Sequence, residues 1–380
     1  MGLRVVTYWV NELTRDDGIG LTFYRREIAP WLPGEILDFH AHIWLNEHLR
    51  ESVGDAAGSR YMVAQSHYPA ENLLADAQQV FPGSSYSAVC FGTPTPLADP
   101  DKANGYAAKA GSNRLFPLLI TGRDMIPRLE LEKRVREEGF FGYKVFLNWH
   151  GDDYGNVTVS DMIGPEEMSL ADELKLIVLL HVPGAGRLAD PEVQRAVREL
   201  SEGYPGAAIV LAHCGRAYMP DEMSRSIEAV RDLENVYLDT AMVMDPTVLQ
   251  IVFANVDSRR VLFATDFPIA NMRGRRVYVM DHWVDVVLNG YPESAFRVAS
   301  NGIRATFMAH EIVLAIKRAA DMAGLSRAQL SAVFHENGMS VLRRVMDGGQ
   351  MGRVVARSAA GNDFGHTRCP GRRRLFPRDR

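Results

Sequence analysis

The sequence predicts an α/β fold of one domain, a (β/α)₈ TIM barrel in which eight parallel strands alternate with helices. Eight short apolar runs rich in β-branched residues are spaced along the chain, and the segments between them carry amphipathic helix signals. The runs are apolar at nearly every position, which is typical of parallel strands that are buried on both faces. Eight such strands favour a closed barrel over an open sheet.

The expected strands are short and lie between residues 35 and 265. They cover residues 35–40, 87–92, 114–120, 142–148, 177–181, 209–213, 236–239 and 261–265. Helices are expected to begin at Asp190-Pro191 and Asp245-Pro246, because a capping acid there precedes a proline at the first helical position. The apolar spacing of residues 220–234 predicts a further helix.

The chain divides into a barrel and two flanking segments. Residues 1–34 show no clear period and are expected to form a cap or a strand across the barrel bottom. Residues 35–346 form the barrel, in which residues 48–80 are expected to be a long insertion over the active face. In residues 347–380 Gly, Ser and Arg dominate, with eight Arg against two Asp from residue 349 on. We expect a solvated, disordered tail there, since aromatic residues are too few for a nucleic-acid-binding arm.

The composition is ordinary for a globular protein, with 47% hydrophobic and 23% charged residues and a net charge of −5. This mild charge gives no reason to expect a nucleic-acid partner. Cys90, Cys214 and Cys369 lie far apart, which favours a reducing compartment over a disulfide framework. No signal-peptide pattern and no apolar run of about 20 residues is found. We therefore expect a cytoplasmic protein without a membrane partner. The sequence is compatible with a homo-oligomer.

Four of the expected strands end on side chains that can bind a metal ion. These are His40 with His42, His181, His213 and Asp266. Catalytic residues of α/β barrels lie at the C-terminal ends of the strands, so all five are expected to meet at one mouth. A single histidine or aspartate at a strand end is more often a core or capping residue. Four strands that all end on such a side chain favour a shared centre. Imidazoles with a carboxylate suit Zn²⁺, and Mn²⁺, Fe²⁺ or Ni²⁺ are acceptable.

Several neighbouring polar residues have two interpretations each. Asp38 shares the strand face of His40 and is expected either to fix the tautomer of a histidine ring or to cap a turn. Arg216 is expected either to bind a substrate carboxylate or to form a surface salt bridge at a helix start. The arginines that follow the eighth strand, Arg273, Arg275 and Arg276, are expected in a solvated loop rather than at the mouth.

The order and spacing of these motifs resemble the amidohydrolase superfamily, and most closely the branch that includes aminocarboxymuconate semialdehyde decarboxylase. The matching motifs are DFHAH at residues 38–42, GYKVF around Lys144, HVPG from His181, LAHCGR around His213 and FATDFP around Asp266. The segment HENGMSVL resembles the closing helix of the family, with Asn337-Gly338 where Asn-Ala is usual. The resemblance covers about residues 35–345 and identifies no substrate.

The resemblance implies a metal centre with assigned roles. It implies that His40, His42, His181 and Asp266 ligate one divalent ion, with zinc the first choice. It also implies that Asp266 and His213 are catalytic. His213 holds the activated water or the substrate, while Asp266 accepts a proton from the water and passes it to the leaving group.

Lys144 has three interpretations. With one metal ion it offers a cation to an acidic substrate. With two ions, as in other amidohydrolases, it is carboxylated and bridges them. In the third interpretation it pairs with a barrel acid such as Asp239. We rank one ion first and two ions second.

The expected function is hydrolysis of a C–O, C–N or C–C bond in a small carboxylated compound by a metal-activated water, with Arg216 as a substrate-binding residue. The first alternative is a non-oxidative decarboxylase that uses the same metal site. The second is an inactive barrel that binds a metabolite or a partner. The complete ligand set argues against the inactive barrel.

Overall fold

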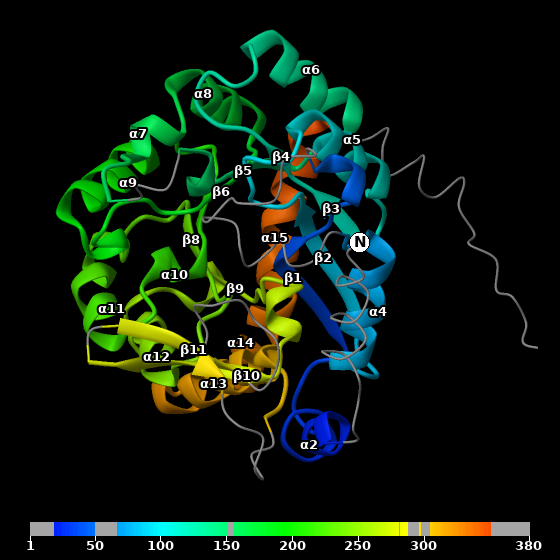
Figure 1. Ribbon diagram of the computed structural model, residues 1–380. Helices are drawn as coiled ribbons and strands as arrows, with labels where there is room; N and C mark the ends of the chain where they lie inside the picture. The colour runs from blue at the N-terminus through cyan, green and yellow to red at the C-terminus, as the bar shows by residue number, and fades with distance from the viewer. Residues whose placement is uncertain are drawn as a thin grey trace, which may run out of the picture.

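The computed structural model describes residues 19–49, 67–150, 155–280, 282–287, 296–297 and 305–350. Within them, short parallel strands form a ring that helices surround (Figure 1). The strands of the ring are β1 (Glu35–His42), β2 (Ser85–Phe91), β3 (Leu115–Pro117), β4 (Leu119–Ile120), β5 (Gly142–Val145), β6 (Ile177–Leu180), β7 (Ala208–Leu211), β8 (Val236–Asp239) and β9 (Val261–Leu262). A separate sheet contains β10 (Gly274–Val279), β11 (His282–Val287) and β12 (Phe296–Arg297).

Backbone hydrogen bonds close the ring. Strands β1 to β3 and β4 to β9 pair in parallel in sequence order. The nitrogen of Phe39 donates to the oxygen of Phe263 at 2.8 Å, and that of Asp266 donates to the oxygen of His40 at 2.9 Å, so the chain after β9 joins β1. The expected eight-stranded barrel is confirmed, with its third strand divided at Leu118 into β3 and β4.

Helices cover the outside of the barrel and one of its ends. The α-helices are α2 (Ile19–Glu27), α4 (Ala70–Val80), α5 (Pro100–Ala110), α6 (Arg128–Glu138), α7 (Val159–Met162), α8 (Pro165–Leu174), α9 (Pro191–Gly203), α10 (His213–Arg216), α11 (Pro220–Ser226), α12 (Pro246–Asn255), α13 (Met308–Ala323), α14 (Arg327–Phe334) and α15 (Glu336–Val345). Short 3-10 helices are η1 (Asn46–His48), η4 (Leu147–His150), η5 (Arg187–Ala189), η6 (Ile227–Ala229), η7 (Ser258–Arg260) and η8 (Ile269–Asn271). The element η9 (Met346–Gln350) is a π-helix.

The two expected helix starts are confirmed. The side chain of Asp190 accepts a hydrogen bond from the backbone nitrogen of Glu192 at 2.9 Å, at the start of α9. The side chain of Asp245 accepts one from the nitrogen of Thr247 at 2.7 Å, at the start of α12. In both helices a proline occupies the first turn, where its missing N–H group leaves no donor unsatisfied.

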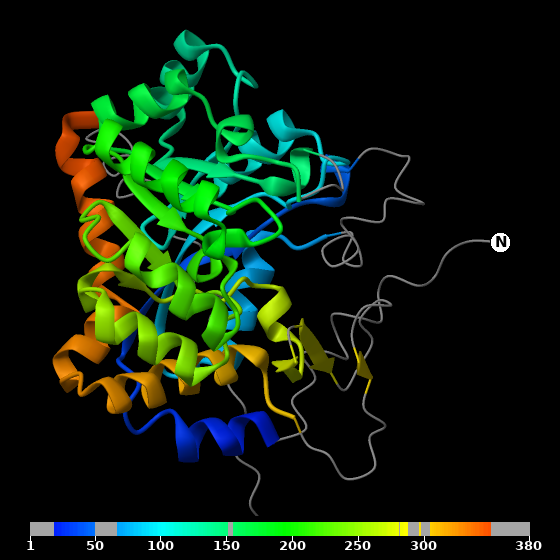
Figure 2. The same cartoon turned by 90° about the vertical axis from the view of Figure 1, so that its left-hand side faces the viewer.

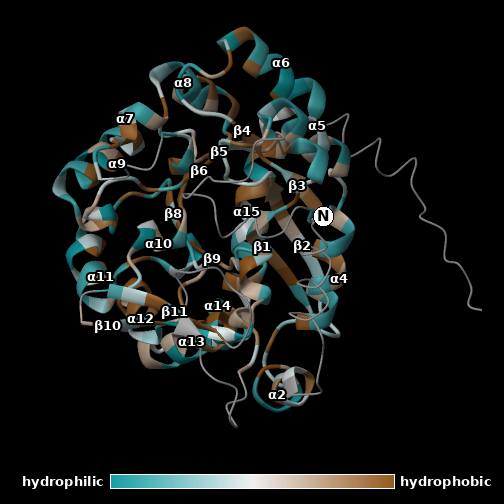
Figure 3. Cartoon of the chain, viewed as in Figure 1, coloured by the Kyte–Doolittle hydropathy of each residue, from teal (hydrophilic) through white to brown (hydrophobic). Residues whose placement is uncertain are grey.

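The barrel strands and the inner helix faces form one core. Every residue of β6, β7 and β8 is buried, which explains why these strands are apolar at almost every position. Figure 3 shows hydrophobic residues concentrated on the strands and hydrophilic ones on the outer faces of the helices. In the part of the chain that the structure describes, no helix is both long and apolar enough to cross a membrane.

Helix α15 packs across the end of the barrel where the strands begin, opposite the hairpin of β10 and β11 (Figure 2). The amide of Asn337 donates to the oxygens of Ser258 at 2.7 Å and Val261 at 2.9 Å, at the start of β9. A Cβ atom on Gly338 would lie 2.8 Å from Cδ2 of Leu37, on β1. Glycine at this position thus allows α15 to lie close to the side chains of Leu37 and Phe39 on β1.

Two expectations about the N-terminal third are corrected. Residues 19–34, the described part of the N-terminal extension, contain α2 and no strand, because Tyr24 and Ile28 bury one side of an amphipathic turn. Residues 1–18 lie outside the described residues. The segment 48–80 contains α4, since Leu73, Ala77 and Val80 are buried at helical spacing. The insertion is therefore shorter than expected, and residues 50–66 lie outside the described residues.

The expected loop after the eighth strand is also wrong, because this region forms the antiparallel hairpin β10–β11. Arg273 is buried, Arg275 donates to the oxygen of Met244 at 3.1 Å, and Arg276 pairs with the buried Asp285. The charges of these arginines led us to expect a solvated loop, but Met244 and Asp285 provide partners for Arg275 and Arg276 within the fold. The hairpin projects beside the end of the barrel where the strands finish (Figure 2).

Two further boundaries differ from expectation. The helix expected over residues 220–234 ends at Ser226, where the tighter turn η6 replaces it. The helical chain continues through η9 to Gln350, beyond the expected barrel limit at residue 346. The expected tail from residue 351 onward lies outside the described residues.

Candidate metal centre

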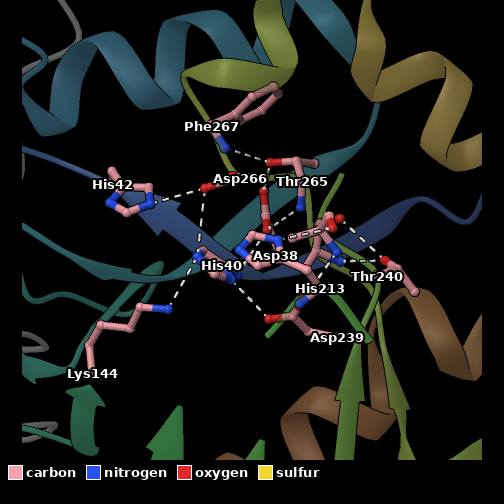
Figure 4. Close-up of polar contacts among 12 residues, drawn as sticks. Asp38, His40, His42, Lys144, His213, Asp239, Thr240, Thr265, Asp266 and Phe267 are labelled. Carbon is pink, nitrogen blue, oxygen red and sulfur yellow. Dashed lines mark hydrogen bonds and ion pairs between the residues drawn. The ribbon is translucent and has the colours of Figure 1, made fainter. Parts of the chain in front are cut away.

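The C-terminal ends of the strands bring most of the predicted side chains together (Figure 4). His40 and His42 lie on β1, while His213 and Asp266 lie in the turns that follow β7 and β9. Possible metal-ligating atoms form two groups, and within each group all the atoms lie within 4.8 Å of one another. One contains His40, His42 and Asp266, and the other contains His40, His213 and Asp239.

Three imidazoles in this centre each point Nδ1 at a fixed acceptor. The pairs are His40 with Oδ2 of Asp239 (2.9 Å), His42 with the oxygen of Gly92 (2.9 Å) and His213 with the oxygen of Ala241 (3.1 Å). Carbonyl and carboxylate oxygens only accept hydrogen bonds, so Nδ1 carries the proton in each neutral ring and Nε2 presents a lone pair. Outer acceptors of this kind fix the tautomer of metal-binding histidines.

The Nε2 atoms of two rings converge on one carboxylate oxygen. Oδ1 of Asp266 lies 3.0 Å from Nε2 of His42 and 3.6 Å from Nε2 of His40. In the neutral tautomers both partners are acceptors, so a positive centre, either a proton or a cation, must accompany the contact. Imidazole nitrogen and carboxylate oxygen are the ligands of Zn²⁺ and related ions. The donor set therefore fits a divalent metal ion.

Burial tunes the charge of these groups. It lowers the pKa of His213 to about 3 and holds the pKa of His40 well below its usual value, so both rings are neutral. Burial opposes ionisation of Asp266, but a positive centre at its contact with His42 and among the neighbouring imidazoles lowers its pKa below the usual carboxyl range. The centre thus offers neutral rings and an ionised carboxylate, the forms that bind a metal ion.

Asp239 was expected only as a partner of Lys144, but in the structure it holds other residues of the centre. Its Oδ2 holds the ring of His40, while its Oδ1 accepts from the backbone nitrogens of His213 at 2.7 Å and Ala241 at 3.1 Å. Burial raises the pKa of this carboxyl, and the hydrogen bonds oppose that rise. The available sequence signal was its place at the end of the apolar strand VYLD, which matches the other site residues.

Among the residues that the structure describes, Asp38 contacts no histidine ring, so the expectation that it fixes the tautomer of one is wrong. Its Oδ1 accepts from the backbone nitrogens of His40 and Thr265, each at 3.0 Å. Its Oδ2 accepts from the hydroxyls of Tyr86, at 2.8 Å, and Thr265. Asp38 therefore ties β1 to the turn that carries Asp266, which agrees with its alternative interpretation as a turn-stabilising residue.

Lys144 extends from β5 toward the histidines (Figure 4). Its Nζ lies 3.4 Å from Nε2 of His40 and 5.0 Å from the ring centroids of Phe91 and Phe146. Burial lowers the pKa of its amine to about 8. The direct polar contact of Lys144 is with His40 and not with Asp239.

His181 and Arg216 lie beside the clusters. The ring of His181 packs edge-on against His213 with 5.3 Å between centroids, and His181 belongs to neither group of converging atoms. Burial, with a smaller effect of Arg216, holds the pKa of His181 well below its usual value. Arg216 donates to the oxygen of Val182 at 2.9 Å, which anchors it to the loop after β6.

The backbone is strained where the site residues leave their strands. The φ angle is 73° at Asp266, and it is 55°, 50° and 61° at His213, Cys214 and Arg216. Residues with side chains adopt this left-handed region at a cost of about 1–3 kcal/mol each, and such strain clusters at functional sites. The turn after β7 directs His213 to the mouth and leaves Cys214 fully buried.

A parallel eight-stranded barrel with a buried imidazole and carboxylate cluster at the C-terminal ends of its strands defines a metal-dependent barrel enzyme. The family model described as Amidohydrolase matches residues 37–344. The chain belongs to this family, and it is therefore a metal-dependent enzyme that acts on small molecules. The resemblance found in the motifs is thus confirmed.

Solved structures share the fold at low sequence identity. A 4-oxalomesaconate hydratase from Rhodopseudomonas palustris is 16% identical, with a TM-score of 0.52 over 82% of this chain and 97% of that chain. An amidohydrolase from Burkholderia multivorans with bound zinc is 13% identical, with a TM-score of 0.51 over 81% and 99%. A candidate 2-pyrone-4,6-dicarboxylic acid hydrolase from Acinetobacter baumannii with citric acid bound is 12% identical, with a TM-score of 0.51 over 81% and 99%. Among curated proteins, no sequence matches the chain.

Proposed function

We propose that the protein is a hydrolase that uses one divalent metal ion to cleave a C–O, C–N or C–C bond in a small carboxylated compound. The observation that carries the proposal is the common orientation of His40, His42 and His213, whose Nδ1 atoms all face protein acceptors. This leaves the Nε2 lone pairs for an ion or a reacting group. Zinc is the first candidate, ahead of manganese, iron or nickel.

The ligands in this proposal are His40, His42, His181 and Asp266. The first two converge with Asp266 on one point. His181 is proposed as the fourth because its ring is neutral and packs edge-on against the ring of His213. An ion held there lowers the pKa of a water molecule and polarises a substrate carbonyl.

The residues around the ion divide the proton and charge transfers. Asp266 accepts a proton from the attacking water at its carboxylate and returns it to the leaving group. His213 keeps its Nδ1–H on the oxygen of Ala241, so its Nε2 orients the water or the substrate. Arg216 binds a substrate carboxylate, for which guanidinium geometry is well suited.

We propose one ion rather than two, with Lys144 as an uncarboxylated amine. Its Nζ lies 3.4 Å from Nε2 of His40 and against two phenylalanine rings, an environment that suits a cation facing an acidic substrate. A cytoplasmic location is part of the same proposal. The free, buried thiols of Cys90 and Cys214 support it, whereas Cys369 lies outside the described residues.

The test of the proposed reaction is turnover in ¹⁸O-labelled water, after a screen of lactones, amides and aromatic acids has given a substrate. A hydrolase places one labelled oxygen in the product. A decarboxylase, which can use the same residues, instead releases carbon dioxide and places solvent deuterium on the carbon that carried the carboxyl group. That second result would overturn hydrolysis in favour of a lyase, and binding without any turnover would favour an inactive barrel.

A further inference from the structure

The hairpin β10–β11 is fixed beside the metal centre by one buried charge pair and two aromatic rings. Arg276 donates from Nε and Nη2 to the two oxygens of Asp285, at 2.8 and 2.9 Å. Its guanidinium carbon lies 3.9 Å from the ring centroid of Trp283 and 4.5 Å from that of Tyr218. Tyr218 belongs to the loop after β7, so this stack joins the hairpin to the loop that carries His213.

Tyr218 is held from the backbone side as well. Its nitrogen donates to Oε2 of Glu222 at 3.1 Å, and Oε1 of Glu222 accepts from Arg187 at 2.6 Å. The ring of Tyr218 lies 6.1 Å from the ring of His213, measured between centroids. Backbone and ring are therefore positioned together, next to a residue of the centre.

The hydroxyl of Tyr218 makes no hydrogen bond to any residue that the structure describes. The residue as a whole is only 8% exposed, but its hydroxyl oxygen is not fully enclosed by protein, so it is open to a bound molecule. The charges of Arg276, Arg216 and Asp266 all affect the pKa of this hydroxyl, which burial raises. The hydroxyl of Tyr218 therefore lies close enough to the carboxylate of Asp266 and to the two guanidinium groups for their charges to act on it.

We infer that Tyr218 is a substrate-binding residue whose hydroxyl donates a hydrogen bond to an anionic oxygen of the substrate, and that Arg276 and Trp283 hold its ring in place. The inference deepens the proposed function, because the substrate occupies the same mouth. The ring alone would serve a purely structural role, so the hydroxyl, which has no partner among the described residues and is open to a bound molecule, is the group left for the substrate. Arg276, whose charge Asp285 neutralises, is a positioning residue and not a second anion-binding group.

The test compares two Tyr→Phe variants of the full chain loaded with zinc. Calorimetric titration with isophthalate, a planar dicarboxylate that cannot be hydrolysed, measures anion binding without a known substrate. Tyr218→Phe should weaken isophthalate binding about tenfold, the effect of losing one hydrogen bond to a charged group. Tyr143→Phe is the matched control, since the hydroxyl of Tyr143 is also unpartnered but Tyr143 faces away from Lys144 on β5. It should leave binding unchanged.

The positioning part is tested by a double-mutant cycle. Arg276→Lys keeps the charge but loses the planar stack and the paired hydrogen bonds, so it should also weaken binding of isophthalate. If Arg276 acts through Tyr218, the change should add little in the Tyr218→Phe background. Fully additive effects would overturn the positioning role.

Equal affinity of wild type and Tyr218→Phe, or no binding of isophthalate to wild type, would overturn the substrate-binding role. The zinc content of each preparation separates this inference from the proposed function. If zinc does not load but isophthalate binding still depends on Tyr218, the metal-dependent hydrolysis is wrong and the inference stands.

Discussion

Oδ2 of Asp239 accepts the hydrogen bond from Nδ1 of His40 at 2.9 Å, and the other oxygen of the same carboxylate holds the backbone nitrogen of His213 at 2.7 Å. One buried side chain at the end of β8 therefore orients an imidazole from β1 and fixes the turn after β7. This relationship links three strands of the barrel into one preorganised centre.

Asp239→Asn should lower metal affinity by about 10- to 100-fold, the usual effect of removing an acceptor behind a metal-binding histidine. The amide retains the shape of the side chain, but it no longer favours the protonated Nδ1 of His40 as strongly. Competition with a chromophoric chelator measures the affinity. Asp245→Asn, which makes the same chemical change but keeps the cap of α12, serves as the control. Unchanged affinity in Asp239→Asn would remove Asp239 from the support of the site.

Asp266→Asn should lower kcat by about 100-fold or more while the fold stays intact. Asparagine cannot accept the proton, but it tolerates the left-handed backbone at φ 73° better than most residues. Thermal melting followed by circular dichroism checks the fold, and steady-state kinetics checks the activity. Turnover at the wild-type rate would exclude Asp266 as the proton acceptor.

His181 and His213 are expected to separate binding from catalysis. His181→Asn should reduce the metal content, because His181 is proposed as a ligand. His213→Asn should retain the metal but lower kcat, because His213 acts on the water or the substrate. Elemental analysis and kinetics on both variants decide the assignment. The reverse pattern, with metal lost only in His213→Asn, would exchange the two roles and agree with the cluster of His40, His213 and Asp239.

His310 should make stability depend on pH at a place remote from the metal centre. Its Nε2 donates to the oxygen of Val80 at 2.8 Å, and its Nδ1 bonds the hydroxyl of Thr306 at 2.6 Å, so both nitrogens of the neutral ring are satisfied. Burial, opposed by the Val80 bond and aided by Arg273, lowers its pKa from 6.5 to about 4. Between these values the unfolded state binds more protons, so stability falls as the pH falls from 6.5 to 4.

The loss attributable to His310 between pH 7 and pH 5 is about 2 kcal/mol. Urea unfolding at the two pH values measures it in wild type and in His310→Gln, whose side chain does not titrate. The variant should be less stable at pH 7 but should lose about 2 kcal/mol less on acidification. An identical pH dependence of the two proteins would show that His310 is not neutral in the folded state.

The barrel was predictable because its strands are buried on both faces and therefore differ sharply in composition from the helices around them. The ends of these strands also located His40, His42, His213 and Asp266, which the structure brings together. The second role of Asp239 was not predictable, since a carboxylate that binds a backbone nitrogen and an imidazole has no sequence pattern of its own. Its contacts depend on the register of β8 beside β7.

The hairpin β10–β11 was missed for a related reason. Its sequence GRRVYV combines charge with β-branched residues, and the charge favours a solvated loop until a partner is known. Asp285 supplies that partner from the other strand of the hairpin, nine residues away. Likewise, the burial of Asp38 could be expected from its strand position, but its bonds to Thr265 arise where the barrel closes.

The most direct test of the metal centre is elemental analysis of the purified protein before and after removal of its metal ions by a chelator. The account predicts about one divalent ion per chain, zinc before others, loss of activity on removal and recovery on adding back one equivalent. It also predicts that His42→Ala binds less than a tenth of an equivalent, because Nε2 of His42 faces Asp266 at 3.0 Å. Full activity in a preparation free of metal, or two ions per chain at full activity, would contradict the account.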